Sequence, residues 1–139
     1  MTVEDYMTQD PMTVTPDTNI EDAALTIYEN KIGALPVVQN SNLVGIISIM
    51  DMLGLFVDMM GILHSSSRID VEIGDNPKNL EKVIGIIKAH DLTIISASES
   101  PHDHKTGKTV YSFRLDLCET DIVVKKIERA GFNVLVALD

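Results

Sequence analysis

The amino-acid sequence predicts an α+β protein made of two small units in series. The order of elements is the first indication: strand–helix–strand–strand–helix before residue 62 gives way to strand–helix–strand–strand–helix–strand after it. A short stretch with a histidine, two serines and little hydrophobic pattern separates the two. We therefore predict units at residues 1–62 and 67–139, joined by a linker at 63–66.

Turn residues and hydrophobic spacing define the first unit. Thr18 or Asn19 can cap a helix with acidic residues in its first turn, and Gly33 is placed to end it. The predicted elements are a short strand at 12–15, that helix, strands at 35–38 and 43–47, and a helix from 49 to about 60.

The second unit begins with an alternating strand at 69–73, whose odd positions should face a core. A helix follows Pro77, and a second helix begins at Thr120 or Asp121 and ends at Gly131. The remaining strands are predicted at 92–98, 110–117 and 133–138. This βαββαβ order predicts two helices on one face of an antiparallel sheet.

The charge pattern excludes several functional classes. The net charge is −10, and residues 1–62 carry nine acids and one base, Lys31, so we expect no general nucleic-acid binding. The apolar stretch 45–63 contains Asp51 and Asp58, so no membrane span is expected. The N-terminus does not resemble a signal peptide and the lone Cys118 suits a reducing compartment, which together predict a cytoplasmic protein.

Three segments of the first unit match a known motif in the correct order: 3–8 (VEDYMT), 32–38 (IGALPVV) and 43–51 (LVGIISIMD). Through them, the first sixty residues resemble a single CBS motif. Residues 67–138 resemble an ACT domain in element order and turn placement. The combination resembles the C-terminal part of acetoin-utilisation regulatory proteins, in which two CBS motifs precede the ACT domain where this chain has one.

The CBS resemblance implies a partner, because CBS motifs work in pairs. A lone motif of this size would leave apolar helix faces exposed, and such a patch calls for burial. We therefore expect a homodimer through the CBS units, and through the ACT units as well, in which two chains complete each other. The residues expected at this surface are Ala24, Ile27, Leu53, Phe56, Met59 and Met60.

The same resemblance implies a small-molecule ligand, usually an adenosine derivative, with no cofactor required. Since Lys31 is the one cation of the first unit, AMP, adenosine or S-adenosylmethionine is favoured over ATP. The alternative is that Ser48 only caps a helix and Asp51 is a first-turn acid. The candidate ligand-binding residues are Thr13, Val14, Thr15, Ala34, Leu35, Pro36, Ser48 and Asp51.

The ACT resemblance implies an amino-acid effector near the loop after the first strand of that domain. Lys78 occupies the position where the family loop usually has glycine, which narrows the approach of a ligand. A unit that only dimerises is therefore favoured over one that binds an amino acid. The candidate effector loop consists of Asp75, Asn76, Pro77, Lys78, Asn79 and Leu80.

No catalytic motif is recognisable, so the sequence predicts a regulatory sensor and not an enzyme. His102 and His104 lie in a predicted hairpin tip without a third fixed ligand, so no metal site is expected. Cys118 has no neighbouring base that would activate its thiol. The alternative function is a structural oligomerisation module whose ligand sites have degenerated.

Overall fold

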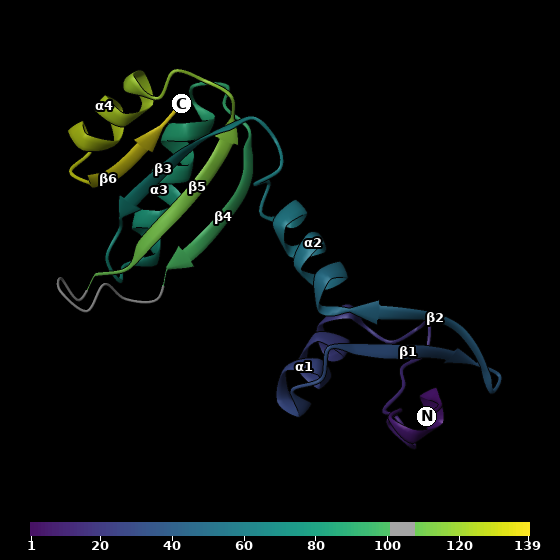
Figure 1. Cartoon of the computed structure of the whole chain (residues 1–139). Coiled ribbons are helices and arrows are strands. Elements are labelled where there is room, and N and C mark those ends of the chain that lie inside the picture. Colours follow the sequence, from purple (N-terminus) through teal and green to yellow (C-terminus); the bar gives the residue numbers. More distant parts are fainter. Residues whose placement is uncertain (101–107) are drawn as a thin grey trace. The chain divides into compact units, whose positions relative to one another are not determined.

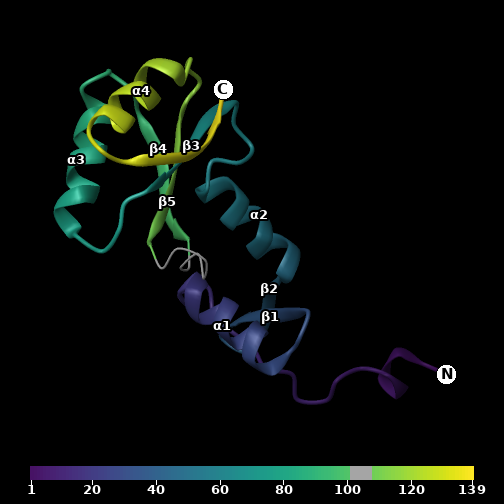
Figure 2. The same ribbon diagram turned by 90° about the vertical axis from the view of Figure 1, so that its left-hand side faces the viewer.

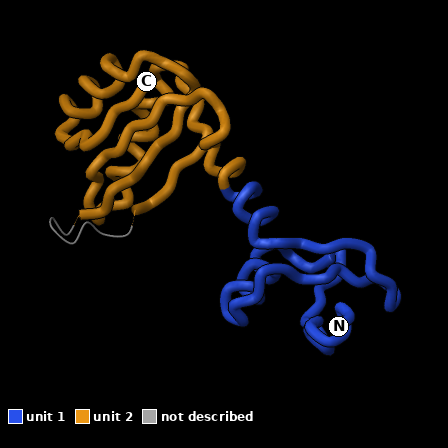
Figure 3. Tube along the Cα trace, viewed as in Figure 1, with its two compact units in different colours: residues 1–56 blue, residues 57–139 orange. Residues whose placement is uncertain are grey.

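The computed structural model of the chain describes residues 1–100 and 108–139 (Figure 1). The chain divides into two compact units, Met1–Phe56 and Val57–Asp139 (Figure 3). The dividing point falls inside helix α2 (Ile49–Met59). The predicted domain limits, with a linker at 63–66, stay a prediction.

The first unit is a two-stranded antiparallel sheet with helices, as predicted. The predicted strand at 12–15 is reduced to one residue, Val14, which forms a parallel bridge with strand β1 (Ala34–Gln39). The Val14 N–H donates to Pro36 O at 3.0 Å, and the Val14 carbonyl accepts from Val38 N at 2.8 Å. The elements are a 3-10 turn at Val3–Asp5, α1 (Ile20–Asn30), β1 (Ala34–Gln39), β2 (Asn42–Ser48) and α2 (Ile49–Met59).

Helix α1 ends before the glycine that was expected to end it. Its last residue is Asn30, and Lys31 takes the left-handed conformation at φ 53°. The N–H of Ile32 then donates to Ile27 O at 3.2 Å, and that of Lys31 to Tyr28 O at 3.4 Å. This is the Schellman pattern, in which a lysine occupies the position that usually holds glycine, because the two bonds satisfy the last carbonyls of the helix.

The core of the first unit is small. Its fully enclosed side chains come from α1, β1 and α2, and a few half-buried aliphatic residues pack around them. The buried residues are Ala23, Ile27, Leu35 and Met52.

The second unit is the predicted βαββαβ arrangement (Figure 2). Its sheet is antiparallel with the strand order β4-β5-β3-β6, and α3 and α4 pack on one face of it. The elements are β3 (Ser66–Glu72), α3 (Pro77–Lys88), β4 (Ile94–Ser100), β5 (Val110–Asp116), α4 (Asp121–Arg129) and β6 (Asn133–Leu138).

Strand alternation decides which side chains of this sheet are buried. The odd positions of β3 lie in the core, as the sequence pattern predicted. They pack with residues of β5, α3 and α4. On β3 and β5 the opposite face carries polar side chains, whereas β6 adds Val136 and Leu138 to it. The buried core residues are Ile69, Val71, Ile73, Val83, Ile87, Phe113, Leu115, Val123 and Ile127.

A buried glycine fixes the segment that leads into this sheet. Gly61 has φ +70°, and a Cβ atom there would lie 2.6 Å from Ile95 Cγ2. Next to it, Ser96 Oγ donates to Met60 O at 2.9 Å. Both the backbone conformation and the close approach therefore require glycine at this position.

Gly61→Ala should lower the free energy of unfolding of the second unit by roughly 2–4 kcal/mol. This figure adds the cost of holding alanine in the left-handed conformation to the cost of overpacking against Ile95. Gly74→Ala is the matched control, because Gly74 has φ +71° with no atom within 4 Å of its Cβ position. Urea denaturation, monitored by circular dichroism, should show a loss of about 1–2 kcal/mol in unfolding free energy for the control. Equal losses for the two variants would show that the contact with Ile95 is not restrictive.

Candidate functional site

The predicted ligand-binding residues of the first unit lie on three adjoining segments. The segment around Val14 is hydrogen-bonded to β1 at Pro36, and Ala34 at the start of β1 pairs with Ser48 at the end of β2. Asp51 follows in the first turn of α2 and is hydrogen-bonded to Ser48. The fold thus brings these residues, which are spread over about forty positions, into one region.

Ser48 and Asp51 form a capping box at the start of α2. Asp51 Oδ2 accepts from Ser48 Oγ at 2.6 Å and from Ser48 N at 2.8 Å, and Asp51 N donates back to Ser48 Oγ at 3.3 Å. The pKa of Asp51 is lowered mainly by the hydrogen bond from the Ser48 hydroxyl and next by the one from the Ser48 backbone N–H. The carboxylate is solvent-exposed, so it is charged and accessible while it caps the helix.

The other predicted residues differ in what they offer a ligand. Leu35 is fully buried, backbone included, and packs in the core of the unit. Thr13 is exposed, whereas Thr15 is held in a turn with Thr18, whose Oγ accepts from Thr15 N at 3.0 Å. Backbone groups and one carboxylate suit a ligand with a base edge and hydroxyls.

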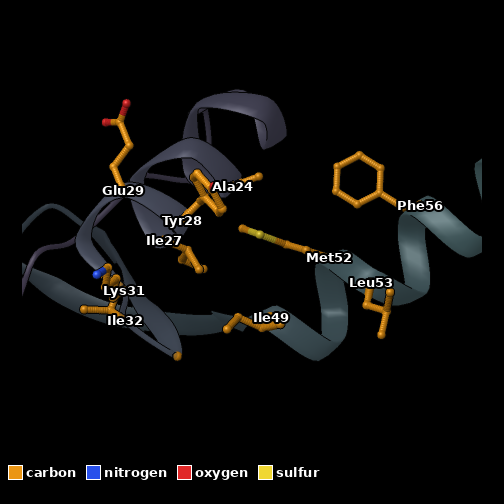
Figure 4. A pocket seen from close by; sticks show the side chains of 11 residues that line it. Ala24, Ile27, Tyr28, Glu29, Lys31, Ile32, Ile49, Met52, Leu53 and Phe56 are labelled. Carbon is orange, nitrogen blue, oxygen red and sulfur yellow. The ribbon is translucent and has the colours of Figure 1, made fainter. Parts of the chain in front are cut away.

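A groove of about 860 Å³ lies between α1 and α2 within this unit, as Figure 4 shows. Its lining is mostly apolar, and several of these side chains are exposed: Tyr28 by 81%, Leu53 by 50% and Phe56 by 42%. Ala24, Leu53 and Phe56 line it as predicted. The groove is an uncovered apolar surface of the kind that a partner buries.

Two predictions for this surface need refinement. Ile27 reaches the groove but is only 5% exposed, because it belongs to the core of the unit. Met59 and Met60 are exposed but belong to the second unit and do not line the groove. Tyr28 was not singled out for this surface, although its spacing of four residues from Ala24 places both on one helix face.

The predicted effector loop of the second unit is ordered by its own side chains. Asn76 caps α3 by accepting from Lys78 N at 3.1 Å, and Pro77 occupies the first helical turn. Asn79 Nδ2 donates to Ile73 O at 3.0 Å. Asp75 Oδ1 accepts from Thr109 Oγ1 at 3.2 Å.

Four of the six loop residues, Asp75, Asn76, Pro77 and Leu80, line a hollow of about 350 Å³, and Lys78 and Asn79 do not. The rest of the lining includes Glu99 and Tyr111, whose hydroxyl donates to Glu99 Oε2 at 2.9 Å; this bond raises the pKa of Tyr111. Sequence reasoning missed both, because they are on β4 and β5 and join the loop only through strand pairing.

The other candidates add no site. His102 and His104 lie outside the described residues. Within residues 1–100 and 108–139, no three histidine, cysteine or acidic side chains are grouped to hold a metal ion. Cys118 is half-buried, and its backbone makes two hydrogen bonds with the Ser67 hydroxyl. Cys118 N donates to Ser67 Oγ at 2.8 Å, and Ser67 Oγ donates to Cys118 O at 2.9 Å. In the same part of the chain, no helix has the length and apolarity to cross a membrane.

Comparison with known proteins supports the assignment of the first unit. Residues 3–58 match the family model of the CBS domain. The chain is also 28% identical over 121 residues to inosine-5'-monophosphate dehydrogenase of Methanocaldococcus jannaschii; the match covers 86% of this chain but 24% of that protein, so the chain spans about a quarter of its length.

Among solved structures, prephenate dehydratase from Streptococcus mutans aligns with a TM-score of 0.41 and 11% identity, over 88% of this chain and 81% of that one. The description of the second unit as ACT-like therefore rests on its own element order and strand pairing. The predicted link to acetoin utilisation has no support in these comparisons.

Ser48→Ala should raise the pKa of Asp51 toward its ordinary value, since the main donor to the carboxylate is lost. A depressed folded-state pKa means that this carboxylate stabilises the fold above the unfolded-state pKa and that the effect is lost as the pH falls through the folded-state pKa. Carboxyl carbon NMR titration measures the change. Asp139, whose pKa is lowered by Thr120, is the internal control and should not move. An unaltered Asp51 titration would contradict the capping geometry.

Proposed function

Starting from the CBS domain at residues 3–58, we propose that this chain is a non-catalytic sensor that binds an adenosyl ligand in a cleft completed by a second copy. The observation that carries the proposal is the convergence of Val14, Ala34–Pro36, Ser48 and Asp51 on adjoining segments of one unit. The Asp51 carboxylate can accept from ribose hydroxyls, and an adenine edge can be read by backbone groups of these segments that are not already paired.

The apolar groove supports the dimer. Its exposed side chains belong to a unit with four buried hydrophobic residues of its own, so burial by a partner would add substantially to stability. Completing the burial of one half-exposed leucine contributes about 1 kcal/mol. A symmetric pairing places the groove of each copy against that of the other. The ACT-like unit would then mediate further dimerisation or sense an amino acid.

A second candidate function is a structural oligomerisation module that binds no ligand. The capping box favours it, because Oδ2 of Asp51 is already engaged by Ser48 in the free chain. In that case the carboxylate serves the helix alone. The two functions differ in what a nucleotide does to the protein.

Isothermal titration calorimetry with AMP, adenosine, S-adenosylmethionine and ATP tests the ligand. AMP should bind at least as tightly as ATP, since residues 1–62 contain one cation, Lys31. Asp51→Asn, which keeps an acceptor for the cap, should weaken binding at least about tenfold through loss of a charged hydrogen bond. Asp22→Asn is the matched control, because Asp22 holds the same third position of α1. Absence of heat with all four ligands would favour the structural module.

Sedimentation velocity tests the dimer. Leu53→Glu should weaken self-association at least about a hundredfold, because burying an ionised carboxylate costs several kcal/mol. Leu25→Glu should leave it unaltered, since Leu25 is 53% exposed, close to the 50% of Leu53, but does not line the groove. A wild-type monomer at all concentrations, or equal effects of the two variants, would refute pairing through the groove.

A further inference from the structure

The face of the second sheet that turns away from α3 and α4 carries an unusual charge arrangement. Arg68 of β3 and Arg114 of β5 are direct partners in the antiparallel register. Ser96 of β4 pairs with Arg114 from the other side, so the three side chains form one row across the sheet. Like charges directly opposite each other destabilise an antiparallel pair. The row therefore calls for a compensating negative charge.

The protein supplies part of that charge. Arg68 makes a two-pronged contact with Asp70, with Nε–Oδ1 at 2.8 Å and Nη2–Oδ2 at 2.7 Å. Arg114 Nη1 donates to the neutral Ser66 Oγ at 2.9 Å. No described carboxylate forms an ion pair with Arg114. One positive charge of the row thus remains uncompensated within the described chain.

The two arginines line a pocket of about 120 Å³. Ser96, Ser98 and Ser112 add hydroxyl groups to its wall, and Met60 and Ile62 add apolar cover. Its volume equals that of roughly four liquid waters, which is too small for a nucleoside but suits a compact oxyanion.

The apolar cover is fixed in place by the fold. Gly61 sits between the two covering residues, and its position is set by the close approach to Ile95. Ser96 Oγ holds Met60 O at 2.9 Å. The Arg114 side chain lies against this segment, since a Cβ atom at Gly61 would lie 3.2 Å from Arg114 Cδ. The pocket is therefore built by the unit before any ligand arrives, which lowers the entropic cost of binding.

From these contacts we infer that the pocket beside Arg68 and Arg114 binds a phosphate-type oxyanion. A guanidinium presents donors in a planar fork that matches phosphate oxygens, and Arg114 can offer the Nε–Nη2 edge that Ser66 does not contact. Arg68 contacts Asp70 through Nε and Nη2, and Nη2 also donates to Ser112 Oγ at 3.4 Å, so Arg68 would contribute Nη1 and its positive charge. The hydroxyls of Ser98 and Ser112 supply neutral donors. Occupation would replace the repulsion between the arginines by two attractive contacts. This site lies within the second unit and is separate from the nucleotide cleft proposed for the first.

The first test is calorimetric titration of the full chain with inorganic phosphate at constant ionic strength. The wild type should bind one phosphate per chain, and Arg114→Gln should weaken binding at least about tenfold. Arg129→Gln, on the exposed surface of α4, is the control and should bind as the wild type does. Equal binding by the two variants, or no binding by the wild type, would overturn the inference.

A second measurement separates a binding site from a structural role of Arg114. In phosphate-free chloride buffer, Arg114→Gln should be at least as stable to urea as the wild type, because it removes like-charge repulsion. Adding phosphate should shift the wild-type midpoint upward and leave the variant where it was. A variant that is less stable in chloride, and that responds to phosphate as the wild type does, would assign Arg114 to packing alone. Arg114→Lys, which keeps the charge but loses the fork, should bind phosphate with intermediate affinity.

Comparison of anions identifies the source of the oxyanion. If the ligand is free phosphate, phosphate should bind more tightly than glycerol phosphate and acetate; if it is a phosphomonoester, glycerol phosphate should bind at least as tightly. Acetate binding more tightly than both would overturn the phosphate assignment. Asp51→Asn should keep phosphate binding intact, so failure of the proposed nucleotide cleft and failure of this pocket are distinguishable.

Discussion

The first unit has more apolar surface than it can bury, and this imbalance governs the rest of its design. Its enclosed core consists of four side chains, whereas the groove between α1 and α2 exposes large residues such as Tyr28 and Phe56. Any partner that covers the groove binds the folded unit and not the unfolded chain. Association through the groove would therefore add to the stability of the unit.

Helix α2 connects two features of that unit. Its first turn carries the Ser48–Asp51 capping box, and its next turns supply Met52 to the core and Leu53 to the groove. A ligand that competed for the Asp51 carboxylate would act on the first turn of α2. The same helix also forms part of the proposed dimer surface. Coupling between ligand and partner needs such a shared element, one whose position both can bias.

The second unit separates its two faces by chemistry. The face under α3 and α4 is closed by aliphatic residues and Phe113, which leaves the opposite face free to carry charge. There, the arginine row faces a small pocket, whereas the loop before α3 borders a larger hollow. The unit thus has two hollows of different size, about 120 Å³ beside the arginine row and about 350 Å³ beside the loop.

The sequence by itself determined the element order and the buried faces, since both follow from local periodicity: alternation in β3 was enough to place Ile69 in the core. It did not determine how segments pair. Val14 forms only a single bridge, with hydrogen bonds to Pro36 and Val38 far along the chain. Lys31 takes the position of glycine at the end of α1, where its N–H and that of Ile32 satisfy the last carbonyls of the helix. Only the tertiary structure decided that Arg68 and Arg114 face each other, because register between strands far apart in the chain is set by the whole sheet.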